Sequence, residues 1–164
     1  LLDDPRSLGR PTDVLILRGG VELWPAVAVG AVAGWRALRR SAKGALASLA
    51  DATPAALVGY AAYEGACLVR SGCFGPRSKV GLVPSGLASP MVPIGLFVTV
   101  CVVLLAAAVR RRTKGNSFDG LMLGVGGLAL LRAVASIWLP KIGNGLTRQH
   151  LESIVVLSLS MLAF

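Results

Sequence analysis

Apolar residues fill five stretches of this chain, and polar or basic residues separate them. Several of these stretches approach the length of about 20 residues that a helix needs to cross the hydrocarbon core of a bilayer. The pattern therefore predicts an all-α fold, a polytopic transmembrane helical bundle with about five spans and a single membrane domain over residues 1–164. The predicted spans are Val21 to Leu38, Pro54 to Val69, Met91 to Val109, Gly120 to Leu139, and Leu151 to Phe164.

Local signals place the starts of three of these spans. Thr53 before Pro54 predicts an N-cap followed by a proline at the first helical position, where its missing N–H does no harm. Asn116 predicts a cap for the fourth span, and Thr147 predicts one for the last span.

Composition supports a membrane protein. The chain is 54% hydrophobic and 15% charged, with a mean hydropathy of +0.70, which exceeds what a soluble domain of this length carries. Its formal net charge of +9 would suggest a nucleic-acid partner in a soluble protein. Here the basic residues lie at the ends of apolar stretches, so they indicate membrane topology and anionic lipids as partners and argue against nucleic acid.

The two ends of the sequence suggest a fragment. The chain begins at Leu1 without a methionine and stops inside an apolar stretch at Phe164, so we expect a longer protein with further spans upstream. Acidic and basic residues interrupt the first twenty positions, and we therefore predict no signal peptide.

Two basic clusters predict the orientation. Lys and Arg close to the ends of spans resist translocation, so the loops after the first and third spans are predicted to be cytoplasmic. The C-terminus then lies in the cytoplasm, and the loop of residues 70–90 lies outside. The clusters are Arg36, Arg39, Arg40 and Lys43, and Arg110, Arg111, Arg112 and Lys114.

Two charged residues, Glu64 and Arg132, lie deep inside predicted spans. A central Arg costs roughly 2.5 to 3.5 kcal/mol on insertion, whereas each Leu, Ile or Val returns only about 0.3 to 0.6. The apolar residues around Arg132 therefore only balance its cost, and Arg132 needs a partner or a wet cavity. Ionisable residues at such depth indicate a functional site.

The outer loop and the single histidine offer further candidate chemistry. Arg70, Arg77 and Lys79 could line a site for a lipid phosphate, or they could be ordinary interfacial anchors. His150 has no clustered His or Cys beside it, so no metal site is predicted, and we interpret it as a cap or interface residue.

Several features follow one another in a recognisable order. They are Arg18-Gly19-Gly20 before the first span, the basic loop from Arg36 to Lys43, the run from Tyr63 to Gly75 with Cys67 and Cys73, the proline turn from Ser89 to Leu96, the buried Arg132, and the polar turn Thr147-Arg148-Gln149. In order and spacing the chain resembles the C-terminal portion of the bacterial prolipoprotein diacylglyceryl transferases, over nearly its whole length. Glu64 stands at the position of that family's signature Arg, and Ser136 at that of an acidic residue.

The resemblance implies an inner-membrane enzyme that moves the diacylglyceryl group of phosphatidylglycerol onto the lipobox cysteine of a prolipoprotein, whose signal peptide it recognises, with no cofactor. Such a reaction needs a cation for the phosphate leaving group and a base for the thiol. Arg132 and Arg70 would serve the phosphate, and Glu64 or Glu22 would act as base. The resemblance thus implies catalytic roles for Glu64 and Arg132, and substrate-binding roles for Arg18, Gly19, Gly20, Arg70 and Gly75.

The residues leave two other functions open. Glu64 could instead neutralise Arg132 in a structural ion pair, which would give a catalytically silent phospholipid-binding homologue. Charges within spans and helices broken by glycine also occur in transporters, so a small transporter or assembly subunit is the other alternative.

Overall fold

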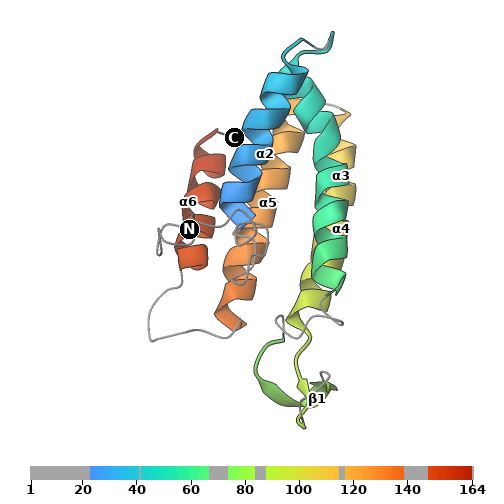
Figure 1. Cartoon of the computed structure of the whole chain (residues 1–164), viewed down its shortest axis with the longest axis vertical. Coiled ribbons are helices and arrows are strands. Elements are labelled where there is room, and N and C mark those ends of the chain that lie inside the picture. The colour runs from blue at the N-terminus through green and yellow to red at the C-terminus, as the bar shows by residue number, and fades with distance from the viewer. Residues whose placement is uncertain are drawn as a thin grey trace, which may run out of the picture.

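A computed structural model describes residues 23–40, 42–66, 74–83, 88–114, 117–138 and 148–163. Within these residues the chain forms five α-helices and one short β-strand (Figure 1). In chain order they are α2 (Leu23–Leu38), α3 (Ala45–Gly65), β1 (Arg77–Leu82), α4 (Ile94–Thr113), α5 (Ser117–Trp138) and α6 (Arg148–Ala163). The prediction of a mostly helical chain is confirmed, whereas the strand was not predicted.

The helices alternate in direction and lie along one long axis (Figure 1). Helix α3 packs against both α4 and α5, α5 also packs against α6, and α2 packs against α3. The short connection between α4 and α5 makes these two helices antiparallel neighbours, as in helical bundles. Helices α3, α4 and α5 therefore form the centre of the described structure, and α2 and α6 lie on its flanks.

Among the described residues, three helices, α3, α4 and α5, are long and apolar enough to cross a membrane. Helices α2 and α6 have 16 residues each, which gives a length of about 24 Å against a hydrocarbon core of about 30 Å. Large apolar side chains point outward, and Leu162 of α6 and Val29 of α2 are 85% and 70% exposed. Such an apolar outer surface is typical of helices that contact lipid.

Helix α3 begins at Ala45, well before the predicted start at Pro54. Thr53 is not an N-cap, because its hydroxyl donates to the Leu49 carbonyl at 2.9 Å and Pro54 lies inside the helix. A proline inside a helix removes one backbone hydrogen bond, which is why Pro54 was expected at a helix start. Helices that pack against other helices in a membrane tolerate this loss, and the prediction was therefore wrong. The chain turns into α3 at Gly44, whose φ of 80° is a conformation that glycine adopts without steric cost.

The other boundaries lie close to those predicted. Helix α4 begins at Ile94 and continues through the basic cluster to Thr113. The predicted caps Asn116 and Thr147 lie outside the described residues, although α5 and α6 begin immediately after them.

Small residues set the spacing of the central helices. A Cβ added to Gly124 of α5 would lie 2.6 Å from the Thr53 methyl group of α3, so the two backbones approach closely there. Val109 of α4 and Leu57 of α3 lie beside this contact, at 3.6 and 3.8 Å from the same Cβ position, and both are buried. Close approach at small residues is the usual basis of helix association in membranes, where apolar burial alone gives no preference for protein over lipid.

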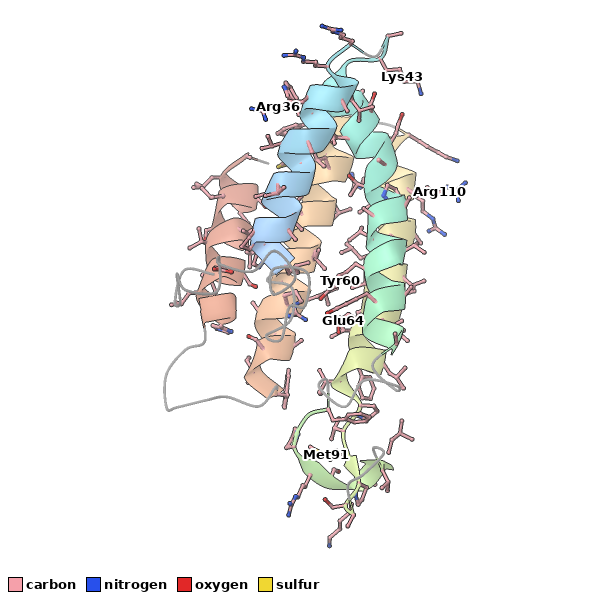
Figure 2. All side chains as sticks on the ribbon, viewed as in Figure 1. Arg36, Lys43, Tyr60, Glu64, Met91 and Arg110 are labelled. Atoms are coloured by element: carbon pink, nitrogen blue, oxygen red, sulfur yellow. The ribbon has the colours of Figure 1, made fainter. Side chains whose placement is uncertain are left out.

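Strand β1 lies beyond the ends of α3 and α4, at the end of the molecule where Figure 2 labels Met91. Its two ends, Arg77 and Leu82, both form bridges with Met91, and Gly81 packs directly on the Met91 backbone. Backbone hydrogen bonds from Ser78 N–H to Pro90 and from Val92 N–H to Pro76 fix this small unit.

Candidate functional site: a buried ion pair and its neighbours

Glu64 and Arg132 meet inside the bundle. The Arg132 Nη1 donates to the Glu64 Oε1 at 3.0 Å, and the two side chains are only 10% and 9% exposed. Tyr60, one turn before Glu64 on the same face of α3, donates its hydroxyl to the same Oε1 at 2.5 Å. Figure 2 places Tyr60 and Glu64 together on the half of α3 nearer to Met91. One carboxylate oxygen therefore holds two donors from two helices.

Glu64 lies nearer to a helix end than predicted. It stands in the last turn of α3, which ends at Gly65, whereas Arg132 is six residues before the end of α5 at Trp138. Six residues of helix span about 9 Å. The pair is thus buried, and it lies toward the Met91 end of the bundle rather than at its middle.

The last turn of α3 is fixed by α4. The Thr99 hydroxyl lies 3.2 Å from the Ala61 carbonyl of α3 and 2.8 Å from the Gly95 carbonyl of its own helix. Gly65 leaves space for the same threonine, since an added Cβ would lie 3.5 Å from its side chain. These contacts hold the α3 backbone next to α4 and so set the position of Glu64.

Arg132 keeps one buried donor unused. Its Nε has no hydrogen-bond partner among the described residues, although the side chain is almost fully buried. Nη1, which binds Glu64, is the terminal nitrogen on the opposite side of the guanidinium from the Nε–H. The edge formed by Nε–H and Nη2–H is the one that grips two oxygens of a phosphate side-on. An unsatisfied buried donor is costly, so this edge is suited to an anionic ligand.

A second polar contact lies one turn further along α5. Ser136 is 4% exposed, and its Oγ lies 2.5 Å from the His150 Nδ1 in the first turn of α6. Nearby on α6, the buried Ser153 accepts a hydrogen bond of 2.9 Å from the Trp24 indole N–H, which attaches the start of α2 to α6. Polar side chains thus connect α5 to α6 and α6 to α2.

Of the residues to which the resemblance assigns catalytic or substrate-binding roles, the structure describes three. Glu64 and Arg132 are brought together, whereas Arg18, Gly19, Gly20 and Arg70, together with Glu22, lie outside the described residues. Gly75 is buried, and a Cβ there would lie 2.7 Å from the Ile94 side chain and 3.4 Å from the Trp138 carbonyl. Its close packing gives a structural reason for glycine at this position, and its role toward substrate stays a prediction.

The sequence analysis did not identify the contacts made by three residues of the site, Tyr60, Ser136 and His150. Tyr60 could have been found, because a polar side chain four residues before Glu64 shares its helix face. The contact between Ser136 and His150 depends on how the chain turns between α5 and α6, and no local spacing indicates it. Within the described ranges, no group of three or more His, Cys, Asp or Glu residues could hold a metal ion.

Comparison of the chain with protein-family models, with characterised proteins and with solved structures finds no match. The function must therefore be argued from the site itself.

Proposed function

We propose that this chain is part of a multi-pass protein of the bacterial inner membrane that transfers the diacylglyceryl group of phosphatidylglycerol to the lipobox cysteine of a prolipoprotein. The observation that supports this most is the buried Arg132, whose Nε–H has no hydrogen-bond partner within the part of the chain that the structure describes. A buried guanidinium edge is a suitable site for a phosphate that must leave from an apolar environment. The order of sequence features shared with the diacylglyceryl transferases supports the same reaction.

The distribution of charge supports an orientation. Figure 2 labels Arg36, Lys43 and Arg110 toward one end of the bundle and Met91 at the other, and Arg110 belongs to the basic last turn of α4. The positive-inside rule would place the basic end in the cytoplasm, and the C-terminal end of α6 with it. Glu64 and Arg132 would then lie in the outer half of the membrane, where a secreted prolipoprotein presents its cysteine.

Arg132 would stabilise the leaving group. In the proposed reaction the thiol sulfur attacks the diacylglycerol methylene carbon, and the bond from that carbon to the phosphate oxygen breaks. The electron pair passes to the glycerol phosphate, whose negative charge increases as it departs. The guanidinium edge can stabilise this charge more than it stabilises the bound lipid, and only such differential binding accelerates the reaction.

Glu64 would position Arg132 rather than act as the base. Its Oε1 already accepts hydrogen bonds from Tyr60 and Arg132. Both of these hydrogen bonds would have to be rearranged before the same oxygen could accept a proton from a thiol. The base assigned to Glu64 from the sequence is therefore not the role that this geometry favours.

A phospholipid-binding protein without turnover is the second candidate, and the same geometry favours it. The Glu64 carboxylate forms an ion pair with one side of the Arg132 guanidinium. In a silent binder this carboxylate would permanently take the place of a phosphate on that side. In that case the chain would bind an anionic headgroup weakly at Nε and transfer nothing.

Mass spectrometry of a lipobox peptide incubated with the full-length protein and phosphatidylglycerol distinguishes the two candidates. We expect the parent protein to add the mass of one diacylglyceryl group. Arg132→Lys should keep lipid binding but slow transfer by about 100-fold or more, because Lys lacks the planar fork and loss of one such donor typically costs that factor. Arg110→Lys, the same change at an exposed position, is the matched control and should transfer at the parental rate.

Two outcomes would count against the proposal. Binding of phosphatidylglycerol without any added mass would exclude the transferase and leave the silent binder. Equal rates for Arg132→Lys and Arg110→Lys would show that Arg132 does not contact the leaving group.

A further inference from the structure

Six arginines at the basic end of the bundle carry charges that no acidic side chain balances (Figure 2). All six are exposed, and within the described part of the chain none of them forms an ion pair. Lys43, at the same end, is already paired with Asp51 at 3.2 Å. Like charges gathered at one end repel one another, so this end favours anions from outside the chain. The six are Arg36, Arg39, Arg40, Arg110, Arg111 and Arg112.

Exposed apolar side chains lead directly to these arginines on both helices. On α2, Trp35 is 50% exposed, and Arg36 follows it immediately. The Arg39 N–H donates to the Trp35 carbonyl at 2.8 Å, so the helical turn continues into the cluster. On α4, Leu104 is 65% exposed and precedes Arg110 by less than two turns. Tryptophan is enriched at the level of the lipid headgroups, so the guanidinium groups begin at the depth where lipid phosphates lie.

The directions of the side chains favour many small anions over one protein partner. Arg110, Arg111 and Arg112 are consecutive in a helix of 3.6 residues per turn, so they leave α4 in three directions about 100° apart. All three are exposed. An acidic protein that docked on one side of α4 would miss at least one of them, whereas lipid headgroups surround the helix. A guanidinium group also matches the geometry of a phosphate, to which it can donate two hydrogen bonds.

We propose that the basic end of the bundle binds the headgroups of anionic phospholipids in the leaflet that surrounds it, in preference to zwitterionic lipids. In the proposed orientation this is the cytoplasmic leaflet, so the surface lies on the opposite side of the membrane from Glu64 and Arg132. The inference does not rest on the proposed transfer reaction. Each basic residue near an anionic surface adds an attraction that corresponds to about fivefold in binding. One lipid contacts only part of the surface, so a preference of about threefold to fivefold is expected for a single anionic lipid.

Electron spin resonance with spin-labelled lipids measures this preference. The full-length protein is reconstituted in phosphatidylcholine, and the fraction of lipid that it immobilises is compared for spin-labelled phosphatidylglycerol and for phosphatidylcholine with the same chains. We expect phosphatidylglycerol to be preferred by about threefold to fivefold at about 0.1 M salt. The preference should fall to nearly onefold at about 1 M salt, where the screening length shortens from about 10 Å to about 3 Å. Equal binding of the two lipids at low salt, or a preference that persists at high salt, would overturn the proposal.

Paired variants locate the surface on the molecule. Replacing Arg111 and Arg112 together with glutamine should reduce the preference for phosphatidylglycerol by about half or more. Arg77→Gln combined with Lys79→Gln removes two exposed charges at the opposite end, and this matched control should keep the parental preference. An equal loss in both double variants, or a loss in the control alone, would contradict the assignment to the basic end. The salt comparison uses the unmodified protein, so it tests the proposal even where a variant inserts wrongly.

Discussion

Replacing one member of the Glu64–Arg132 pair should lower the free energy of unfolding by far more than the intact pair raises it. Two unit charges 3.0 Å apart attract by about 5.5 kcal/mol at an effective dielectric constant of about 20. Desolvation of the two ions offsets most of this attraction. Glu64→Gln or Arg132→Gln alone leaves one buried charge without its partner, so we expect each to lower the free energy of unfolding by about 3 to 5 kcal/mol.

The double variant should be milder than the sum of the single variants. Independent effects would add to about 6 to 10 kcal/mol, which is comparable to the whole stability of a typical domain. A neutral pair of glutamines leaves no buried charge, so we expect a coupling energy of at least about 3 kcal/mol. The exposed pair of Lys43 and Asp51, with an N–O distance of 3.2 Å and side chains 73% and 50% exposed, is the matched control and should give a coupling energy of about 0 to 1 kcal/mol.

Equilibrium unfolding in mixed micelles, followed by circular dichroism, measures all seven proteins of the two cycles, which share the parent. The reasoning would be refuted if the losses at Glu64 and Arg132 added to within about 0.5 kcal/mol. It would equally be refuted if the buried cycle gave no larger coupling energy than the exposed one.

Three further changes test the geometry. Tyr60→Phe removes one donor from the buried carboxylate and should lower the free energy of unfolding by about 1.5 to 3 kcal/mol, as measured in the same micelles. Gly124→Val should cost about 1 to 3 kcal/mol, because its side chain would overlap the Thr53 methyl group, and unchanged stability would contradict the close helix contact. A reporter active only in the cytoplasm should be active after Lys43 and silent near Lys79, and activity near Lys79 would reverse the proposed orientation.

Matched substitutions control the first two of these changes. Tyr63→Phe alters a tyrosine that is 43% exposed and should change stability less than Tyr60→Phe does. Gly59→Ala adds a methyl group where nothing lies within 4 Å, and it should be neutral or slightly stabilising because alanine is the better helix former.

The helices could largely be predicted from the sequence, because hydrophobic length directly reflects the requirement of a bilayer. The start of α3 could not be predicted, since Thr53 followed by Pro54 is typical of a helix start in isolation. In the folded chain, packing against α5 at Gly124 outweighs that local preference. Strand β1 was missed because its pairing with Met91 depends on contacts outside the strand itself.

The ion pair could be predicted for an energetic reason. The neighbours of Arg132 only balance the cost of burying it, so a partner was expected, and Glu64 was the acidic residue deep inside another predicted span. The bond between Ser136 and His150 has no such signature. Each of these side chains alone is tolerable in a helix, and only the rotation of α6 relative to α5 brings them together.

The charge balance at Arg132 suggests why the chain would keep Glu64 in a site that binds phosphate. Arg132 and Glu64 are neutral together, which lowers the cost of placing a guanidinium in the membrane. A phosphodiester brings one negative charge, so its binding beside the pair is opposed by Glu64. The Nε–H edge of Arg132 faces away from Glu64, so the charge that the phosphate would gain as it departs lies nearer to the guanidinium than to the carboxylate. Attraction therefore increases in the transition state more than in the bound lipid, which is the condition under which binding energy accelerates a reaction.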